Sequence, residues 1–255
     1  MKSEKKTALG ESVNKTKLES DADSRLFELK DAITPQMGPH WNLHSNLFVK
    51  RIALSRLLYL NKIYEQILNV PGVICEFGVQ WGATLATLSN LRGMLEPYNY
   101  SRTIIGFDTF SGFAGADVKD GGLVAKGDYA TMSDYMPKLE EIMQMHENAS
   151  PLPHIKKFEL VKGDASKTAP EWLENNPHAI ISLAIFDMDV YKPTKDVLEA
   201  VLPRLTRGSI LVFDELNCPR FPGETQAVHE VLGLGSLKLQ RDPSQPYCAW
   251  AVWGE

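Results

Sequence analysis

The sequence predicts an α/β fold: a mostly parallel seven-stranded sheet with a C-terminal antiparallel hairpin and helices on both faces. Segments that read as strands alternate with segments of helical spacing, which is typical of βαβ units. Strand segments such as "LAIF" (183–186) are continuous apolar runs, as expected where both faces of a parallel sheet are covered. The last two strand segments are separated only by the turn-rich "DPSQP" (242–246), which favours antiparallel pairing.

The elements follow in order along the chain. A helix is expected over 46–69, because apolar residues recur there at helical spacing and the pattern stops before Pro71 and Gly72. Strands are expected over 72–79, 102–108, 156–164, 180–189, 208–215, 236–241 and 247–253. Helices are expected over 82–95, 133–148, 166–176, 193–205 and 223–234.

Composition and length limit the class of protein. The 255 residues suffice for one large domain, and 44% of them are apolar. A net charge of −5 gives no indication of a nucleic-acid or membrane partner. Three cysteines without paired spacing fit a reducing cytoplasm, where we expect the protein to reside.

Domain boundaries follow from local composition. The polar N-terminus has no signal-peptide core, and we expect a flexible tail over residues 1–23. A single domain is expected over 24–255, with an N-terminal helical cap over 24–70. The polar, glycine-rich segment after the second strand begins a lid-like insertion over 111–154.

Acidic residues lie at the carboxyl end of every predicted parallel strand, where ligands bind in open α/β sheets. They are Glu76, Asp108, Asp164, the pair Asp187 and Asp189, and the pair Asp214 and Glu215. A carboxylate at the end of a buried strand is unfavourable unless a cation or hydrogen-bond donors meet it. Such a repeated pattern predicts one shared site.

The turns after the first three strands have both a ligand-binding and a structural interpretation. Gly78 and Gly82 fit a backbone that approaches a ligand closely, or a tight turn without one. Asp108 is placed to accept ribose hydroxyls. Asp164 is placed to accept from an adenine amino group, to cap the helix that follows, or to do both. Trp81, inside the glycine turn, is placed to pack against a cofactor.

These strand-end motifs, in this order, resemble those of class I S-adenosylmethionine-dependent methyltransferases, with their Rossmann-like fold. Within that class the motifs "VPGVICEFGVQWGATLATL", "IIGFDTFSGF", "LAIFDMDVYKPTKDVLEAVLPRLTRGSILVFDE" and "AVHEVLG" are similar to the macrocin O-methyltransferase family, which methylates sugar hydroxyls on natural products. The similarity covers roughly residues 70–233. Met188 stands where the family usually has glycine, and Glu215 where it has aspartate.

The resemblance implies two sets of binding residues. The set expected to bind S-adenosylmethionine is Glu76, Phe77, Gly78, Trp81, Gly82, Thr84, Asp108, Thr109, Phe110, Gly163, Asp164, Ala165, Ser166 and Asp187. The set expected to hold a divalent metal is Asp187, Asp214 and Glu215. Oxygen ligands without His or Cys suit Mg²⁺, or another hard divalent ion, rather than Zn²⁺.

The implied reaction requires a general base. A sugar hydroxyl holds its proton tightly at neutral pH, and a bound cation with a neighbouring carboxylate would allow the proton to leave. Asp187 and Asp189 both remain candidates for this catalytic role. If the strand continues through them, they point to the same face.

Expected partners follow from the same resemblance. The acceptor is expected to be a glycosylated small molecule or a nucleotide sugar. Apart from the resemblance, the long amphipathic N-terminal helix is expected to pair two chains into a homodimer.

Two alternatives remain at this stage. "AIFDMDVY" also resembles the nucleophile motif of haloacid dehalogenase-like magnesium phosphatases, although three strands precede it here. A non-catalytic nucleotide-binding module would carry the same acids merely as solvated groups.

Overall fold

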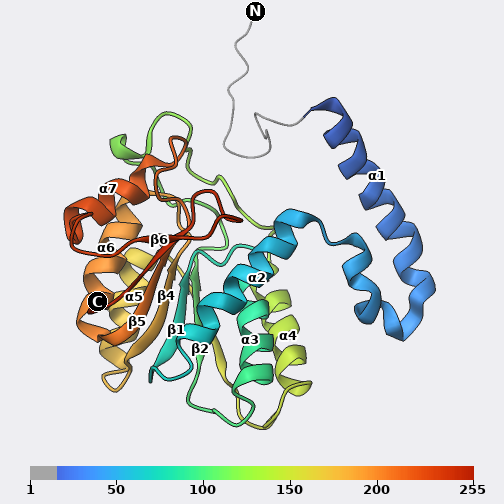
Figure 1. Ribbon diagram of the computed structural model, residues 1–255, viewed down its shortest axis with the longest axis horizontal. Coiled ribbons are helices and arrows are strands. Elements are labelled where there is room, and N and C mark those ends of the chain that lie inside the picture. Colours follow the sequence, from blue (N-terminus) through green and yellow to red (C-terminus); the bar gives the residue numbers. More distant parts are fainter. Residues whose placement is uncertain (1–15) are drawn as a thin grey trace, which may run out of the picture.

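Seven strands form a single sheet in the computed structural model, which describes residues 16–255 (Figure 1). Their order is β3-β2-β1-β4-β5-β7-β6. The strands are β1 (Val73–Phe77), β2 (Ile104–Asp108), β3 (Phe158–Lys162), β4 (Ile181–Phe186), β5 (Leu205–Phe213), β6 (Gln240–Arg241) and β7 (Ala249–Val252). β1 to β5 pair in parallel, and β7 pairs antiparallel with both β5 and β6. The predicted sheet and its terminal hairpin are confirmed.

Helices cover both faces of this sheet (Figure 1). Residues of α2, α3 and α4 share one apolar core with the strands, and residues of α5, α6 and α7 share the other. The helical elements are α1 (Lys17–Ile33), η1 (Thr34–Phe48), α2 (Arg51–Gln66), α3 (Ala83–Leu95), η2 (Val118–Asp120), α4 (Tyr135–Asn148), α5 (Ala165–Asn175), α6 (Tyr191–Val201), η3 (Leu202–Arg204) and α7 (Pro222–Val231).

The alternation of side chains along each strand decides which face the acids take. Ile74 of β1, Ile185 of β4 and Val212 of β5 all belong to the core beneath α2, α3 and α4. Side chains alternate with a period of two, so the residues two positions further on face the same way. Those residues are Glu76, Asp187 and Asp214. The sheet therefore delivers these three carboxylates to the side where α2 lies.

The N-terminal region departs from the predicted boundaries. Residues 1–15 lie outside the described part of the chain, so the predicted tail is not tested there. Lys17 to Asp23 are helical rather than flexible, because Thr16 and Glu19 form a reciprocal capping box at the start of α1. The helix predicted over 46–69 is shorter, because the backbone is extended at Val49 and Lys50 before α2 begins.

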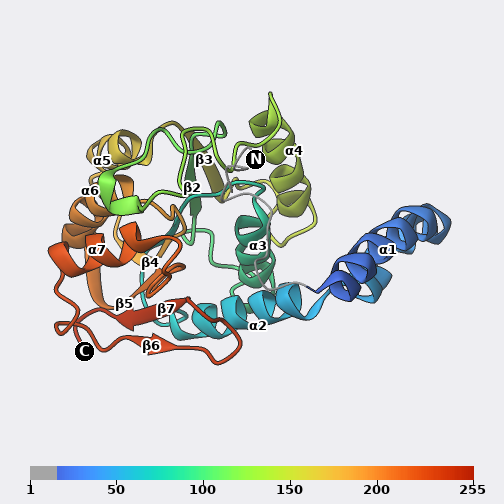
Figure 2. The same cartoon turned by 90° about the horizontal axis from the view of Figure 1, so that it is seen from above.

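α1 and η1 project away from the rest of the molecule. Figures 1 and 2 show them as a pair of helical segments joined to the body through the start of α2. No residue of either element is buried. An ion pair of 2.5 Å between Lys50 and Asp23 links α1 to the entry of α2 and so limits the angle between them.

None of the helices in residues 16–255 combines the length and the apolar character needed to cross a bilayer.

The turn between β1 and α3 depends on a glycine, and this yields a first prediction. Gly78 has φ +96°, and a Cβ built on it would lie 1.8 Å from the carbonyl oxygen of Asp187. We expect Gly78→Ala to lower the free energy of unfolding by at least about 2 kcal/mol, since strain of this kind costs about 1–3 kcal/mol before the clash is counted. Urea denaturation followed by circular dichroism measures the loss.

Gly115→Ala is the matched control, because its Cβ would meet nothing within 4 Å. Equal stability of Gly78→Ala and the wild type would contradict this account of the turn.

Candidate active site

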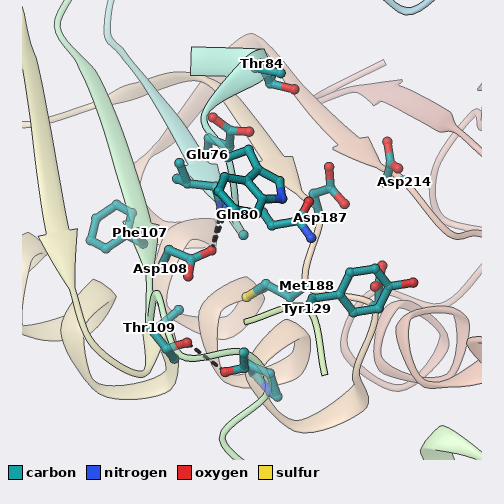
Figure 3. A pocket seen from close by; sticks show the side chains of 18 of the residues that line it. Glu76, Gln80, Thr84, Phe107, Asp108, Thr109, Tyr129, Asp187, Met188 and Asp214 are labelled. Atoms are coloured by element: carbon teal, nitrogen blue, oxygen red, sulfur yellow. Dashed lines mark hydrogen bonds between the residues drawn. The ribbon is translucent and has the colours of Figure 1, made fainter. Parts of the chain in front are cut away.

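A cavity of about 660 Å³ opens at the carboxyl edge of the parallel strands. Its walls come from the ends of β1, β2 and β4, the residues that follow β5, the N-terminal half of α2, and the segment between β2 and α4 (Figure 3). The volume is within the range of small-molecule sites. Because the acids at the strand ends line it, the cavity is the site that the sequence pattern predicts.

Asp108 organises the floor of this cavity. Its Oδ2 accepts hydrogen bonds of 2.8 Å from the backbone N–H groups of Val79 and Gln80, and its Oδ1 accepts one of 2.6 Å from Phe110 N–H (Figure 3). Charge-assisted bonds of this kind are the stronger ones. The carboxylate thus ties the β1–α3 turn to the end of β2, a role beyond the ribose contact expected from the sequence.

The glycines of the same turn are explained by the protein itself. Gly82 has φ +78°, a backbone conformation that other residues rarely adopt, and a Cβ on it would also displace the end of the Leu139 side chain. A Cβ on Gly78 would strike the carbonyl oxygen of Asp187. The tight-turn interpretation of the motif therefore suffices without a ligand.

Glu76 is a buried and only partly compensated acid at the end of β1. It is 1% exposed, and its Oε2 has no hydrogen-bond partner. Burial raises the pKa of this carboxyl well above its usual range, with Arg56 opposing the shift. The carboxyl lines the cavity together with Thr84 of α3 (Figure 3). Its free oxygen suits a cationic or hydrogen-bond-donating group of a ligand.

Arg56 supplies positive charge at the opposite wall. Its guanidinium extends from α2 to form ion pairs with Asp187, at 3.2 Å, and with Asp214. Asp187 and Asp214 themselves lie side by side at the strand ends (Figure 3). Burial and the charge of Asp214 raise the pKa of Asp187, and Arg56 opposes this. The guanidinium therefore bridges two carboxylates that would otherwise repel each other.

Asp189 does not share the face of Asp187 through strand alternation. β4 ends at Phe186, and Asp189 has φ +62°, so the chain has already turned and the period-two expectation no longer applies. The residue is 9% exposed and lines the cavity. Burial, followed by the charges of Glu215 and Asp214, raises the pKa of Asp189 to about 8.

Glu215 is not among the residues that line the cavity with Asp187 and Asp214. Its backbone N–H donates to Glu224 Oε1 at 2.8 Å, and its side-chain Oε2 is buried without a hydrogen-bond partner. Within residues 16–255, no three acidic, histidine or cysteine side chains are already arranged around a possible ion position. The predicted metal ligands Asp187, Asp214 and Glu215 come from the ends of adjacent strands. Arg56 forms ion pairs with the first two of them.

The fold and this edge of the sheet match those of known enzymes. A family model described as a methyltransferase domain matches residues 75–216, which is more than half of the chain. The chain belongs to this methyltransferase family. It is a class I enzyme that depends on S-adenosylmethionine, so the sequence-based recognition is confirmed and the phosphatase alternative is wrong.

Solved structures agree with this assignment. CalS11, described as a calicheamicin methyltransferase, is 40% identical over 95% of both chains, with a TM-score of 0.89. Its apo structure, described as that of a TDP-rhamnose 3'-O-methyltransferase, is 38% identical over 95% of this chain and 97% of that chain, with a TM-score of 0.84. The O-methyltransferase NovP, 18% identical over 78% of this chain and 79% of its own, shares the fold, with a TM-score of 0.57. Curated proteins yield no significant match.

Most of the residues that the sequence predicts for the binding sets of this methyltransferase line the cavity. The lining set includes Glu76, Gly78, Trp81, Thr84, Asp108, Thr109, Gly163, Asp164, Ala165, Asp187, Asp189 and Asp214. Phe77 instead stacks on Phe107 of the neighbouring strand. Phe110 donates its backbone N–H to Asp108, and Gly82 is the N-cap residue of α3. Ser166 donates its backbone N–H to Asp164, which confirms that Asp164 caps α5.

Several residues that line the cavity were not identified from the sequence. The chief one is Arg56, which is 131 residues from its partner Asp187 in the chain. The excess of acids implied a cation, but nothing in the helical pattern of α2 singled out this arginine. Gln80 and Met188, which lie inside the family motifs but were not assigned to the binding sets, also line the cavity, as does Gln245. Tyr129 was not missed, because the sequence suggests it as a contact of the donor or acceptor from the segment after β2. It lines the cavity and packs against Phe221, 6.3 Å between ring centres.

The three bonds to Asp108 generate a second prediction. We expect Asp108→Asn to lower the free energy of unfolding by roughly 2–3 kcal/mol, because an amide removes the charge and replaces one acceptor oxygen with a donor. Asp164→Asn is the matched control, since asparagine caps a helix as well as aspartate does. Denaturation of both variants measures the difference, and equal losses would contradict the turn-anchoring role of Asp108.

Proposed function

We propose that this methyltransferase transfers the methyl group of S-adenosylmethionine to a hydroxyl of a deoxysugar, carried either on a nucleotide or on a natural product. The observation that carries the proposal is the 40% identity over 95% of the chain to an enzyme whose apo structure is described as a TDP-rhamnose 3'-O-methyltransferase. The open cavity supports it, because acids stand at the end where an acceptor hydroxyl must lose its proton.

The donor is proposed to lie along the first three strands. Glu76, with its unpartnered oxygen, suits the ammonium group of the methionine portion. Asp108 keeps a free lone pair on Oδ1, which accepts a single backbone hydrogen bond, for a ribose hydroxyl. The start of α5 at Asp164 and Ala165 is proposed to face the base. This places the sulfonium end of the donor beside Asp187, with the acceptor beyond it.

The chain's own contribution to the reaction is alignment and proton removal. The acceptor oxygen, the methyl carbon and the sulfur must lie in line, and holding them so contributes up to several kcal/mol to lowering the barrier. Asp187 and Asp189 flank the position that the oxygen would take, and one of them accepts its proton. Tyr129 lines the acceptor side of the same space.

A divalent ion is proposed as an exchange partner of Arg56. The donor set fits a hard ion, since Asp187 and Asp214 offer carboxylate oxygens and Glu215 has a buried oxygen without a partner. Arg56 holds the same two carboxylates, so ion and guanidinium exclude each other there. A bound ion would lower the pKa of an acceptor hydroxyl.

The proposed function predicts methyl transfer to TDP-rhamnose. With S-adenosylmethionine carrying a ¹³C-methyl group, we expect a new O-methyl resonance by NMR and one equivalent of S-adenosylhomocysteine. Asp214→Asn is expected to lose at least about a hundredfold in rate. Tight binding of S-adenosylhomocysteine without transfer to this or other nucleotide sugars would overturn the sugar assignment and leave the family assignment in place.

The choice between the two candidate bases can be decided by separating ion binding from catalysis. We expect Asp187→Asn to abolish binding of Mn²⁺, measured by electron paramagnetic resonance, together with activity. Asp189→Asn is expected to keep Mn²⁺ binding and lose about 10²–10⁴ in kcat, as removal of a general base does. Retained activity in Asp189→Asn would exclude Asp189 as the base.

The exchange between Arg56 and the ion makes a separate prediction. Arg56→Met is expected to bind Mn²⁺ at least tenfold more tightly than the wild type, because a competing cation is gone, whereas Arg56→Lys should stay near the wild-type affinity. Calorimetry measures both without an activity assay. Affinity that is unchanged or weaker in Arg56→Met would rule out competition, and methyl transfer undiminished in excess EDTA would remove the ion from the reaction.

A further inference from the structure

The N-terminal arm, residues 17–48, exposes apolar side chains that no other part of residues 16–255 covers. Leu18, Phe27, Ile33, Trp41, Leu43 and Leu47 are exposed, with Leu18 79% and Leu43 71% accessible. The arm packs only as α1 against η1 and stands clear of the body in two perpendicular views (Figures 1 and 2). Helices without tertiary packing are marginal in water, so such an arm requires a surface to pack on.

The first half of α2 continues this apolar surface. Ile52, Leu54, Leu57 and Leu58 are all exposed, whereas Tyr59 to Tyr64 are mostly buried against the sheet. At about 100° per residue, these four side chains spread around more than half of the helix circumference. A helix that is apolar over so wide an arc is normally surrounded by protein.

This face also borders the cavity. Ile52 and Leu57 line its mouth although they are 64% and 40% exposed. Val49 is the first lining residue in the chain, so residues 16–48 contribute nothing to the cavity of their own chain. The acceptor end of the site is therefore open beside an uncovered apolar helix.

The exposed area is large enough for a stable interface. The ten side chains from Leu18 to Leu58 expose roughly 1,000 Å² of apolar surface, if a side chain of this size counts as ~150–200 Å². A standard interface buries about 800 Å² on each partner. The apolar area that the arm and α2 expose is therefore of the size that an interface covers.

A second copy of the same chain fits this surface. Each chain carries both an arm without a partner and an α2 face without a cover, and a two-fold exchange satisfies both at once. The Lys50–Asp23 ion pair holds the arm at a fixed angle to α2, which lowers the entropy lost on pairing.

We propose that the N-terminal arm of one chain packs on the α2 face of a second copy and closes the acceptor end of that copy's cavity. The pairing stands independently of the reaction, and only the closing of the acceptor end rests on the proposed function.

Mass measurement tests the pairing. By sedimentation equilibrium we expect the wild type at twice its chain mass of 28.5 kDa and the double variant Leu43→Asp, Leu47→Asp at the mass of one chain. Tyr98→Asp, Tyr100→Asp is the control, because these residues are 78% and 63% exposed in the turn that leads into β2, outside the proposed interface. A monomeric wild type, or an assembly that the arm variant does not dissociate, would overturn the pairing.

Kinetics test the closing of the site. In the same arm variant we expect an unchanged affinity for S-adenosylhomocysteine, since residues within one chain form the donor end, and a KM for TDP-rhamnose at least tenfold higher. An unchanged KM in a dissociated variant would overturn the closing role while the pairing stands. If the wild type transfers no methyl group to any sugar, the proposed function fails and the mass result is unaffected.

Discussion

The constraint on which this molecule depends is the gathering of buried and half-buried carboxylates at one edge of a parallel sheet. Strand alternation sends Glu76, Asp187 and Asp214 to the same face, and the helix packed there supplies a single guanidinium to two of them. Burying ionised groups without partners is costly, so such a site must be relieved by protonation, by a cation or by a ligand. The pKa values of Glu76 and Asp187 are raised because the positive charge of Arg56 does not offset the cost of their burial. The negative charge that remains in the site attracts a positively charged sulfonium donor.

The donor side of the site is rigid for reasons that lie in the protein itself. Asp108 accepts three backbone hydrogen bonds, and Gly78 and Gly82 leave no room for a side chain. The β1–α3 turn is thus fixed before any ligand arrives, which reduces the entropy lost on binding. The acceptor side is different, because its walls come from α2 and from the segment that carries Tyr129.

The sequence predicted the sheet and the edge at which the site lies, because apolar runs and their terminal acids are local signals. The antiparallel hairpin at one edge followed from the same pattern, whereas the order of the strands in the sheet is known only from the structure. It did not predict Arg56, since a contact across 131 residues leaves no local trace. The sequence also suggested that Asp189 shares the face of Asp187 if the strand continues. The strand does not continue, because Asp189 has a left-handed backbone conformation, and no glycine at this position signals the turn in the sequence. The arm was expected as part of a helical cap, and only the three-dimensional arrangement shows that it projects away from the body of the molecule.

Arg56 and Leu57 are neighbours on α2, and this has a thermodynamic consequence. One side chain reaches the acids, and the next belongs to the apolar face at the mouth of the cavity. A rotation of the helix about its axis moves both together, so whatever fills the carboxylate pair and whatever covers Leu57 act on one coordinate. If an ion displaces Arg56 and a second chain covers Leu57, as proposed above, the two binding events are linked, and linkage is reciprocal. The ion would then change the affinity between chains by the same factor by which association changes the affinity for the ion.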